Sequence, residues 1–362
     1  MPSPHLAILG AGAIGIWLAT RLVQGGARVS LIARPHSAEQ LVQNGLTLDE
    51  EGAVNQRLNW PPATPNLWIG TATALRERLE RSEDAAIDIL LLTVKTQQLL
   101  PALPEFIPLS GAGTLVAFLQ NGIPWWYFHG ISPAHGEPLS AYAGRNLESI
   151  DPQGELPAAL PLARVLGGVI HKSAELLAPG HVRARAVDGD GLIFGSPSGP
   201  IEPGGESVLL SALRQGGIAA QHSADIRTDV WTKLLGNAVL NPVSALADAT
   251  LNDIVDFPPT RRLALAGMAE AVVIARACGV ALDIDLDARL DRARAVGASR
   301  TSMLQDKRQS RELEIDGILG GLLELAALTH SPTPRLETLY AATALLSRNN
   351  AIKAHLHDKK SP

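Results

Sequence analysis

The sequence predicts an α/β domain built on a mostly parallel sheet, followed by an all-helical domain. In the first part of the 362-residue chain, short apolar runs alternate with helical patterns, whereas the pattern from about residue 223 onwards is helical throughout. A glycine-rich turn also separates the first apolar run from the first helical pattern. We therefore expect one domain at 1–222, with an insertion at about 123–154, and a second at 223–362.

The glycine-rich turn has the order of a dinucleotide-binding unit. It follows a predicted strand over His5–Leu9 and opens a predicted helix ending at Gln24, with a second strand over Arg28–Ala33. In this motif the first glycine makes a tight turn, the second lets the backbone approach a pyrophosphate, and the third allows helix–strand packing. The unit predicts a Rossmann-type domain. The turn residues that match G-x-G-x-x-G are Gly10, Ala11, Gly12, Ala13, Ile14 and Gly15.

The rest of the first domain is predicted from apolar runs between turn residues. Strands are expected over 88–94, 113–119, 164–170, 180–186, 191–195 and 217–221, edge strands at 46–48 and 58–60, and a helix over 202–215. The strands after residue 164 are expected to be antiparallel because their connections are short. The insertion lacks periodicity and predicts a long loop or lid.

Polar residues follow four of the predicted strands. Because ligands of open α/β sheets bind at the carboxyl ends of strands, we expect Gly10, Arg34, Lys95 and Asn121 to line one crevice. An NAD site would have an acidic residue near Arg34, whereas a guanidinium suits the 2′-phosphate of NADP, so the pattern favours NADPH. The alternatives are an exposed strand-end arginine, a loop lysine, and a turn role for Asn121 beside Gly122.

The helical domain is predicted to contain helices over 225–248, 258–279, 286–296, 302–329 and 334–347. The first helix carries Lys233, Asn237 and Asn241 at four-residue spacing, which places an ammonium and two carboxamides in one polar stripe. Such a stripe suits a small oxygen-rich ligand, and the alternative is a solvated helix face. Pro242 should end or kink this helix.

Two further polar residues lie on the predicted helix over 302–329. Ser302 also fits a helix N-cap, and Glu314 also fits a solvated helix face. Their spacing corresponds to about 120° round an ideal helix. They would share a ligand only if the helix bends or they reach opposite ends of it.

Composition excludes several classes of function. The net charge is −5 and basic residues are scattered, which disfavours nucleic-acid and membrane partners. No run approaches the ~20 apolar residues of a membrane span, and the histidines outside the C-terminal tail lack zinc-ligand spacing, so no metal is expected. The single cysteine, Cys278, fits a reducing compartment and a buried structural thiol. We expect a cytoplasmic protein.

The chain resembles the ketopantoate reductases (2-dehydropantoate 2-reductases). The segments that carry the resemblance, in the same order, are GAGAIG, LLTVKTQQ, LQNG, GGV and PG between Gly167 and Gly180, WTKLLGNAVLNPVSAL, and SMLQDKR followed by EID. It implies NADPH-dependent reduction of the 2-oxo acid ketopantoate to (R)-pantoate, which leads to pantothenate and coenzyme A. The helical domain would hold the substrate and any homodimer contact.

The resemblance also implies roles for individual residues. Lys233 matches the catalytic proton donor, and Glu314 matches an acid of the catalytic site near the nicotinamide ribose. The residues that match substrate contacts are Asn121, Asn237, Asn241 and Ser302. The residues that match NADPH contacts are Gly10, Ala11, Gly12, Ala13, Ile14, Gly15, Arg34, Lys95, Asn121 and Glu314.

Departures from the family pattern leave the exact 2-oxo acid open. Leu251 stands where some members carry an asparagine, Arg311–Leu313 differs from the usual approach to the glutamate, and the aromatic run Trp125–Phe128 has no counterpart in short members. These rings either pack the insertion onto the first domain or roof the substrate pocket. Alternatives to ketopantoate reduction are reduction of another 2-oxo acid, an opine-type dehydrogenase, and a non-catalytic NADP-binding regulator.

Overall fold

The computed structural model describes residues 3–50, 56–58, 65–81, 86–131, 137–186, 189–199 and 205–358. The chain forms two compact units, each made of two segments. The first comprises Met1–Gln120 and Gly154–Ile226, and the second comprises Asn121–Gln153 and Arg227–Pro362. Residues 121–153 therefore belong with the helices by their contacts, whereas the sequence suggested an insertion in the first domain.

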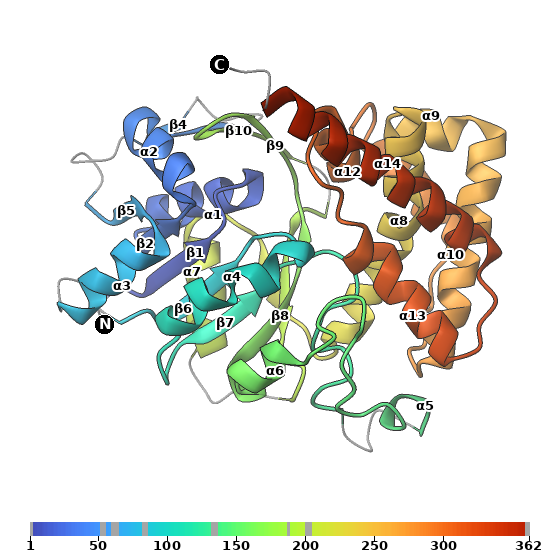
Figure 1. Ribbon diagram of the computed structural model, residues 1–362, viewed down its shortest axis with the longest axis horizontal. Coiled ribbons are helices and arrows are strands. Elements are labelled where there is room, and N and C mark those ends of the chain that lie inside the picture. Colours follow the sequence, from blue (N-terminus) through green and yellow to red (C-terminus); the bar gives the residue numbers. More distant parts are fainter. Residues whose placement is uncertain are drawn as a thin grey trace. The chain divides into compact units, whose positions relative to one another are not determined.

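The first unit is built on an eight-stranded sheet in the order β12-β11-β8-β7-β6-β1-β2-β5. Figure 1 labels the strands of this sheet from β8 to β5. Neighbouring strands are parallel except for the antiparallel pair β8 and β11. The strands are β1 His5–Leu9, β2 Arg28–Ile32, β5 Leu67–Gly70, β6 Ile89–Leu92, β7 Leu115–Phe118, β8 Val165–His171, β11 Gly191–Gly195 and β12 Ala220–His222. The predicted Rossmann-type sheet is confirmed.

The chain order creates a switch point in this sheet. From β1 the chain continues to β2 on one side, and it later returns to β6 on the other side of β1. Loops leaving the carboxyl ends of β1 and β6 therefore diverge, and this divergence forms the usual ligand crevice of an open α/β sheet.

Helices of the first unit make two groups of contacts. One group joins α1 to α7, and the other joins α3 to α4 and α4 to α6. Leu6 and Ile8 of β1 share one buried cluster with Leu22 of α1 and Leu213 of α7, because alternate residues of a strand face the same side. The helical segments are α1 Ala13–Gln24, α2 Pro35–Asn44, α3 Ala72–Glu80, η1 Thr96–Gln98, α4 Leu99–Phe106, η2 Ile107–Leu109, α6 Glu155–Ala159, η4 Leu162–Arg164 and α7 Gly205–Gln215.

A second, four-stranded sheet packs against α1. Its order is β4-β3-β10-β9, and its strands are β3 Leu46–Glu50, β4 Gln56–Leu58, β9 Ser173–Ala178 and β10 His181–Arg185. The edge strand predicted at 46–48 corresponds to β3. The strand predicted at 58–60 begins earlier, and its last two residues, Asn59 and Trp60, lie outside the described ranges.

The second unit is helical. Its segments are α5 Glu137–Ser140, α8 Ile226–Ala247, α9 Leu251–Asp256, α10 Pro258–Ala277, α11 Leu286–Ala295, α12 Ser302–Arg308, the π-helix η5 Asp316–Gly320, α13 Gly321–Leu328 and α14 Pro334–Asp358. None of the helices in the described ranges is long and apolar enough to cross a membrane.

The prediction of one helix over 302–329 was wrong. The α12 helix ends at Arg308, Ser310 has a left-handed backbone (φ 53°), and helical structure resumes only at Asp316. The chain breaks here because the Arg311 N–H donates back to the carbonyl of Asp306 and the Leu313 N–H donates to Ser347 Oγ, at 2.9 and 3.2 Å. These bonds replace the ordinary helical ladder.

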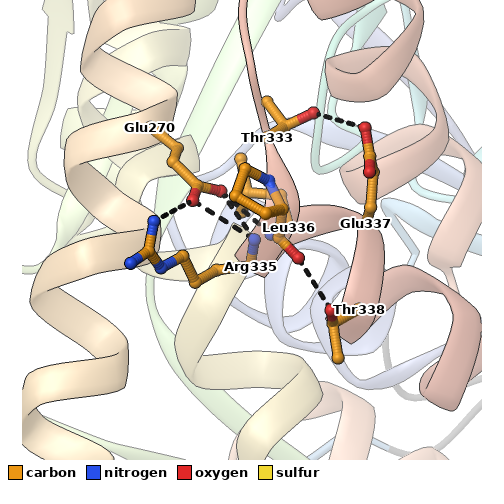
Figure 2. Close-up of polar contacts among 7 residues, drawn as sticks. Glu270, Thr333, Arg335, Leu336, Glu337 and Thr338 are labelled. Carbon is orange, nitrogen blue, oxygen red and sulfur yellow. Dashed lines mark hydrogen bonds and ion pairs between the residues drawn. The ribbon is translucent and has the colours of Figure 1, made fainter.

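The start of α14 is held by a carboxylate from another helix. Glu270 of α10, which is 8% exposed, accepts hydrogen bonds from the backbone N–H groups of Arg335 and Leu336 and from the Arg335 guanidinium (Figure 2). The first N–H groups of a helix have no partner within the helix, so an outside carboxylate satisfies them and favours the positive end of the helix dipole.

Candidate active site

The glycine turn of the first unit has three different roles for its three glycines. Gly10 has φ +116°, and a Cβ placed there would lie 2.8 Å from Thr93 Oγ1, so the turn against β6 requires glycine. A Cβ on Gly15 would collide with the carbonyl oxygen of Gly10, which explains the third glycine. A Cβ added at Gly12 would have no neighbouring atom within 4 Å. Gly12 is the N-cap residue of α1, and no side chain caps the helix there. This open space beside unpaired helix N–H groups fits a pyrophosphate.

The other predicted cofactor residues of the first unit follow neighbouring strands. Arg34 comes two residues after β2, caps α2 and is exposed, and its guanidinium forms no ion pair within the described ranges. Lys95 follows β6, where Thr93 Oγ1 donates to the Gly10 carbonyl at 2.8 Å and ties the two loops together. Gly10, Arg34 and Lys95 therefore lie at the same edge of adjacent strands.

In the second unit, the polar stripe lies on α8. Lys233, Asn237 and Asn241 occupy successive turns of a helix that runs from Ile226 to Ala247. The sequence predicted that Pro242 ends or kinks this helix. Pro242 does not end it, since the helix continues to Ala247. Asn241 is 6% exposed, and within the described ranges its carboxamide has no hydrogen-bond partner.

A tight turn brings Asn121 to this stripe. Asn121 accepts a hydrogen bond from the Asn237 amide at 3.4 Å and donates one to Glu314 Oε2 at 3.2 Å. The following residue, Gly122, has φ +93°, and a Cβ there would collide with the carbonyl oxygen of Gly317. That carbonyl accepts the N–H of Ile123 at 2.8 Å, so the turn is fixed against the chain that carries Glu314.

The break after α12 places Glu314 in this cluster. Glu314 is only 8% exposed, so the alternative of a solvated helix face is wrong. Ser302 is exposed at the first position of α12, and the cap of that helix is Thr301, whose side chain accepts the Leu304 N–H at 3.2 Å. The N-cap alternative for Ser302 is therefore also wrong, and within the described ranges Ser302 forms no hydrogen bond with Asn121, Lys233, Asn237 or Glu314.

The pKa of Lys233 is set by burial and by two charged neighbours. Burial lowers the pKa of its ammonium from an ordinary value of 10.5 to about 8, the Glu314 carboxylate acts in the opposite direction, and Arg289 lowers the pKa further. A lysine with a pKa near neutrality can donate a proton and regain it during each turnover. Among the residues the structure describes, the ammonium forms no ion pair within 4.0 Å.

The sequence did not single out Arg289. It lies on α11, in a run of alternating charges (LDARLDRARA) that is typical of an exposed helix. Its Nη2 atom is 3.1 Å from the position that a Cβ of Gly236 would take, so the guanidinium rests on the backbone of α8 between Lys233 and Asn237. Glycine at 236 was the one available signal, since a Cβ there would lie only 3.1 Å from the guanidinium and would make it shift.

The aromatic run packs inside the second unit. Trp125, Trp126, Tyr127 and Phe128 are each no more than 2% exposed, and the Trp231 indole of α8 donates to the Tyr127 hydroxyl at 2.8 Å. The Arg227 guanidinium of α8 donates to the carbonyls of Tyr127 and His129 and lies over the Trp126 ring. The run therefore packs on α8, whereas the sequence left open packing onto the first domain or a roof over the substrate pocket. Cys278 is buried, as predicted.

Comparisons with known proteins agree with this architecture. Residues 6–125 match the family model "Ketopantoate reductase PanE/ApbA", and residues 225–347 match "Ketopantoate reductase PanE/ApbA C terminal". A 2-dehydropantoate 2-reductase of Mesorhizobium japonicum is 36% identical over 345 residues, which cover 94% of this chain and 97% of the relative.

Solved structures give the same fold. A protein from Ralstonia solanacearum MolK2, described as a candidate ketopantoate reductase, superposes with a TM-score of 0.80 at 32% identity, covering 96% of this chain and 99% of that one. D-mandelate dehydrogenase in a ternary structure with NADH and anilino(oxo)acetate superposes with a TM-score of 0.74 at 20% identity, over 96% and 99% of the two chains. At that identity the second likeness concerns the fold alone.

Proposed function

Because the chain belongs to the ketopantoate reductase family, we propose that it reduces 2-dehydropantoate (ketopantoate) to (R)-pantoate with NADPH, in the route to pantothenate and coenzyme A. The observation that carries the proposal is the cluster of Asn121, Lys233, Asn237 and Glu314 in the second unit. It combines a lysine of lowered pKa with a buried carboxylate and two carboxamides. A cytoplasmic location and a homodimer belong to the same proposal.

Lys233 is the proposed proton donor. When bound, the reduced nicotinamide supplies the hydride to the ketone carbon. Negative charge then develops on the carbonyl oxygen, which the Lys233 ammonium stabilises before donating its proton. Glu314 favours the ammonium form of Lys233, so it keeps the acid charged. Asn237 and Asn241 on α8, with Ser302, are proposed to fix the hydroxyl and carboxylate groups of the substrate. Asn121, held by Glu314 and Asn237, is a further proposed substrate contact.

Most of the proposed cofactor contacts lie in the first unit. The open space at Gly12 and the first turn of α1 suit the pyrophosphate, and Arg34, which no acid of the described residues neutralises, suits a 2′-phosphate. Lys95 is a further proposed contact of the first unit, and Asn121 and Glu314 are the proposed contacts from the second. The absence of an acid at the end of β2 supports NADPH over NADH.

The experiment that tests the function is a substrate panel followed by NADPH absorbance. Ketopantoate should give the highest kcat/KM among 2-oxo acids of different size. Lys233→Met should reduce kcat by about 10²–10⁴-fold while NADPH binding persists. Lys307→Met, which removes the same charge from α12, is the matched control and should stay near wild type. Preference for another 2-oxo acid would replace the substrate, and no reduction of any 2-oxo acid would overturn the function.

A further inference from the structure

We propose that Arg289 binds the carboxylate of the 2-oxo acid substrate, next to the proton donor Lys233. The inference rests on the proposed function and deepens it, because that function leaves the substrate carboxylate without a cationic partner. Arg289 is a residue of α11, outside the short motifs that carried the resemblance in the sequence.

The first argument is the position of the guanidinium. Arg289 Nη2 lies 3.1 Å from the place of a Cβ at Gly236, and residues 233, 236 and 237 share one face of α8. In a 2-oxo acid the carboxylate is bonded directly to the ketone carbon. A group that binds this carboxylate must therefore lie beside the group that protonates the ketone oxygen, as Arg289 lies beside Lys233.

The second argument is an unsatisfied donor. Arg289 Nε is buried and has no hydrogen-bond partner, and no carboxylate of the described residues pairs with this guanidinium. A buried, unpaired donor costs stability, and native structures leave few of them. An arginine presents its donors as a planar fork that matches a carboxylate in two parallel hydrogen bonds. A substrate carboxylate would satisfy the donors that the protein leaves open.

The third argument is the charge balance of the site. Lys233 and Arg289 are two cations near one buried carboxylate, that of Glu314, and Arg289 lowers the pKa of Lys233. Burial also lowers the pKa of Arg289 itself, which reflects the cost of keeping this charge away from water. A substrate anion bound at Arg289 offsets both effects. It would raise the pKa of Lys233 again, so that the acid stays protonated to higher pH while a ketone is bound.

The test compares Arg289→Gln with Arg292→Gln, which removes the same charge from an exposed position of the same helix. For Arg289→Gln we expect KM for ketopantoate to rise roughly ten- to a hundredfold, with KM for NADPH and the melting temperature preserved. The ketopantoate methyl ester, which lacks the carboxylate charge, should be used equally well by wild type and variant. Arg292→Gln should change none of these values.

A pH profile gives a second readout that a purely structural role would not move. In the wild type, kcat/KM, which reports the free enzyme, should fall at alkaline pH with an apparent pKa near that of Lys233, about 8. The value of kcat, which reports the substrate complex, should fall only at a higher pH. In Arg289→Gln the apparent pKa of kcat/KM should rise, so that the difference between the apparent pKa values of kcat/KM and kcat becomes smaller. If Arg289→Gln does not fold, Arg289→Lys tests the same point, since it keeps the charge but loses the fork.

The outcomes separate the two proposals. An equal rise in KM for acid and ester in Arg289→Gln, or no rise beyond that of Arg292→Gln, overturns the role of Arg289 and leaves the reductase function intact. For Arg289→Lys, a smaller rise in KM confined to the acid supports the role, and an equal change for acid and ester overturns it. Failure of the wild type to reduce any 2-oxo acid overturns the reductase function. Calorimetric binding of (R)-pantoate in the presence of NADP⁺ then decides separately whether Arg289 holds a carboxylate.

Discussion

Asn121 and Glu314 are 193 positions apart in the chain, yet the amide of one donates to the carboxylate of the other at 3.2 Å. The bond joins the turn that precedes the aromatic run to the segment between α12 and the π-helix. It also orients a carboxylate whose charge acts on Lys233. The hydrogen bond thereby holds together two segments without regular structure, and both contribute side chains to the candidate site.

The pH dependence of turnover should report this arrangement. Lys233 donates a proton only below its pKa, so kcat/KM should fall as the pH rises through about 8. Glu314 raises that pKa, so Glu314→Gln should move the alkaline limb to lower pH, the direction opposite to Arg289→Gln. Glu312→Gln, two residues earlier and exposed, is the control. A limb that stays in place in Glu314→Gln would contradict the coupling.

Cofactor preference should depend on Arg34. Arg34→Ala should raise KM for NADPH by about ten- to a hundredfold, because a charge-assisted pair with a phosphate is worth roughly 1.5–3 kcal/mol. KM for NADH should change little. Arg183→Ala, an exposed arginine of β10, should affect neither cofactor. Equal losses with NADPH and NADH in Arg34→Ala would show that another residue reads the 2′-phosphate.

The turn at Gly122 should tolerate no side chain. Gly122→Ala should lower the melting temperature and reduce kcat/KM at least tenfold, because a Cβ at this position collides with the Gly317 carbonyl and displaces Asn121. Gly144→Ala separates collision from backbone strain, since Gly144 also has a positive φ (+76°) but no atom within 4 Å of the added Cβ. Gly144→Ala should cost about 1 kcal/mol of stability and leave kcat/KM unchanged. Equal behaviour of the two variants would contradict the argument.

Glu270 should contribute to stability without contributing to catalysis. Glu270→Gln replaces a charged acceptor of two backbone N–H groups and a guanidinium with a neutral amide, which should lower the free energy of unfolding by about 1–3 kcal/mol. Glu337→Gln removes the same charge from an exposed position in the first turn of α14 but keeps an oxygen that can accept the Thr333 hydroxyl, so it should cost less than about 1 kcal/mol (Figure 2). Urea unfolding of the two variants measures the difference.

The buried aromatic run should act mainly through packing. Trp126→Ala should lower the free energy of unfolding by about 3–5 kcal/mol, because the side chain is 1% exposed. Trp126→Phe should cost much less, since the indole N–H has no hydrogen-bond partner in the described residues. The ratio of kcat/KM for ketopantoate to that for larger 2-oxo acids should stay constant. A changed ratio with preserved stability would instead support rings that roof the substrate.

Elements with a single strong pattern were predictable from sequence. The strands β1 and β2 and the long helix α8 follow from continuous apolar runs and helical spacing, and their positions agree with the expectation within one or two residues. The strand β9 was missed because SAELLA is only half buried and carries a glutamate, which reads as well as a loop or a helix.

The part of the site that depends on distant contacts was not predictable. Residues 309–315 carry good helix formers, so local propensity favours one helix over 302–329, and only bonds to Asp306 and Ser347 break it. Without this break Glu314 could not be assigned to a cluster with Asn121. The position of Arg289 was not predictable either, because nothing in the alternating charges of α11 indicates which arginine contacts Gly236.

The discontinuity of the second unit has a consequence for synthesis of the protein. Residues 121–153 leave the ribosome before Gly154–Ile226, which belong to the other unit, and well before α8, whose Arg227 and Trp231 cover the aromatic run. Until α8 emerges, these large rings lack the Arg227 and Trp231 side chains that contact them in the folded protein. Incompletely covered apolar segments of this kind promote aggregation. Slow translation or premature termination ahead of Arg227 should therefore make the nascent chain depend on chaperones, whereas a finished chain should not.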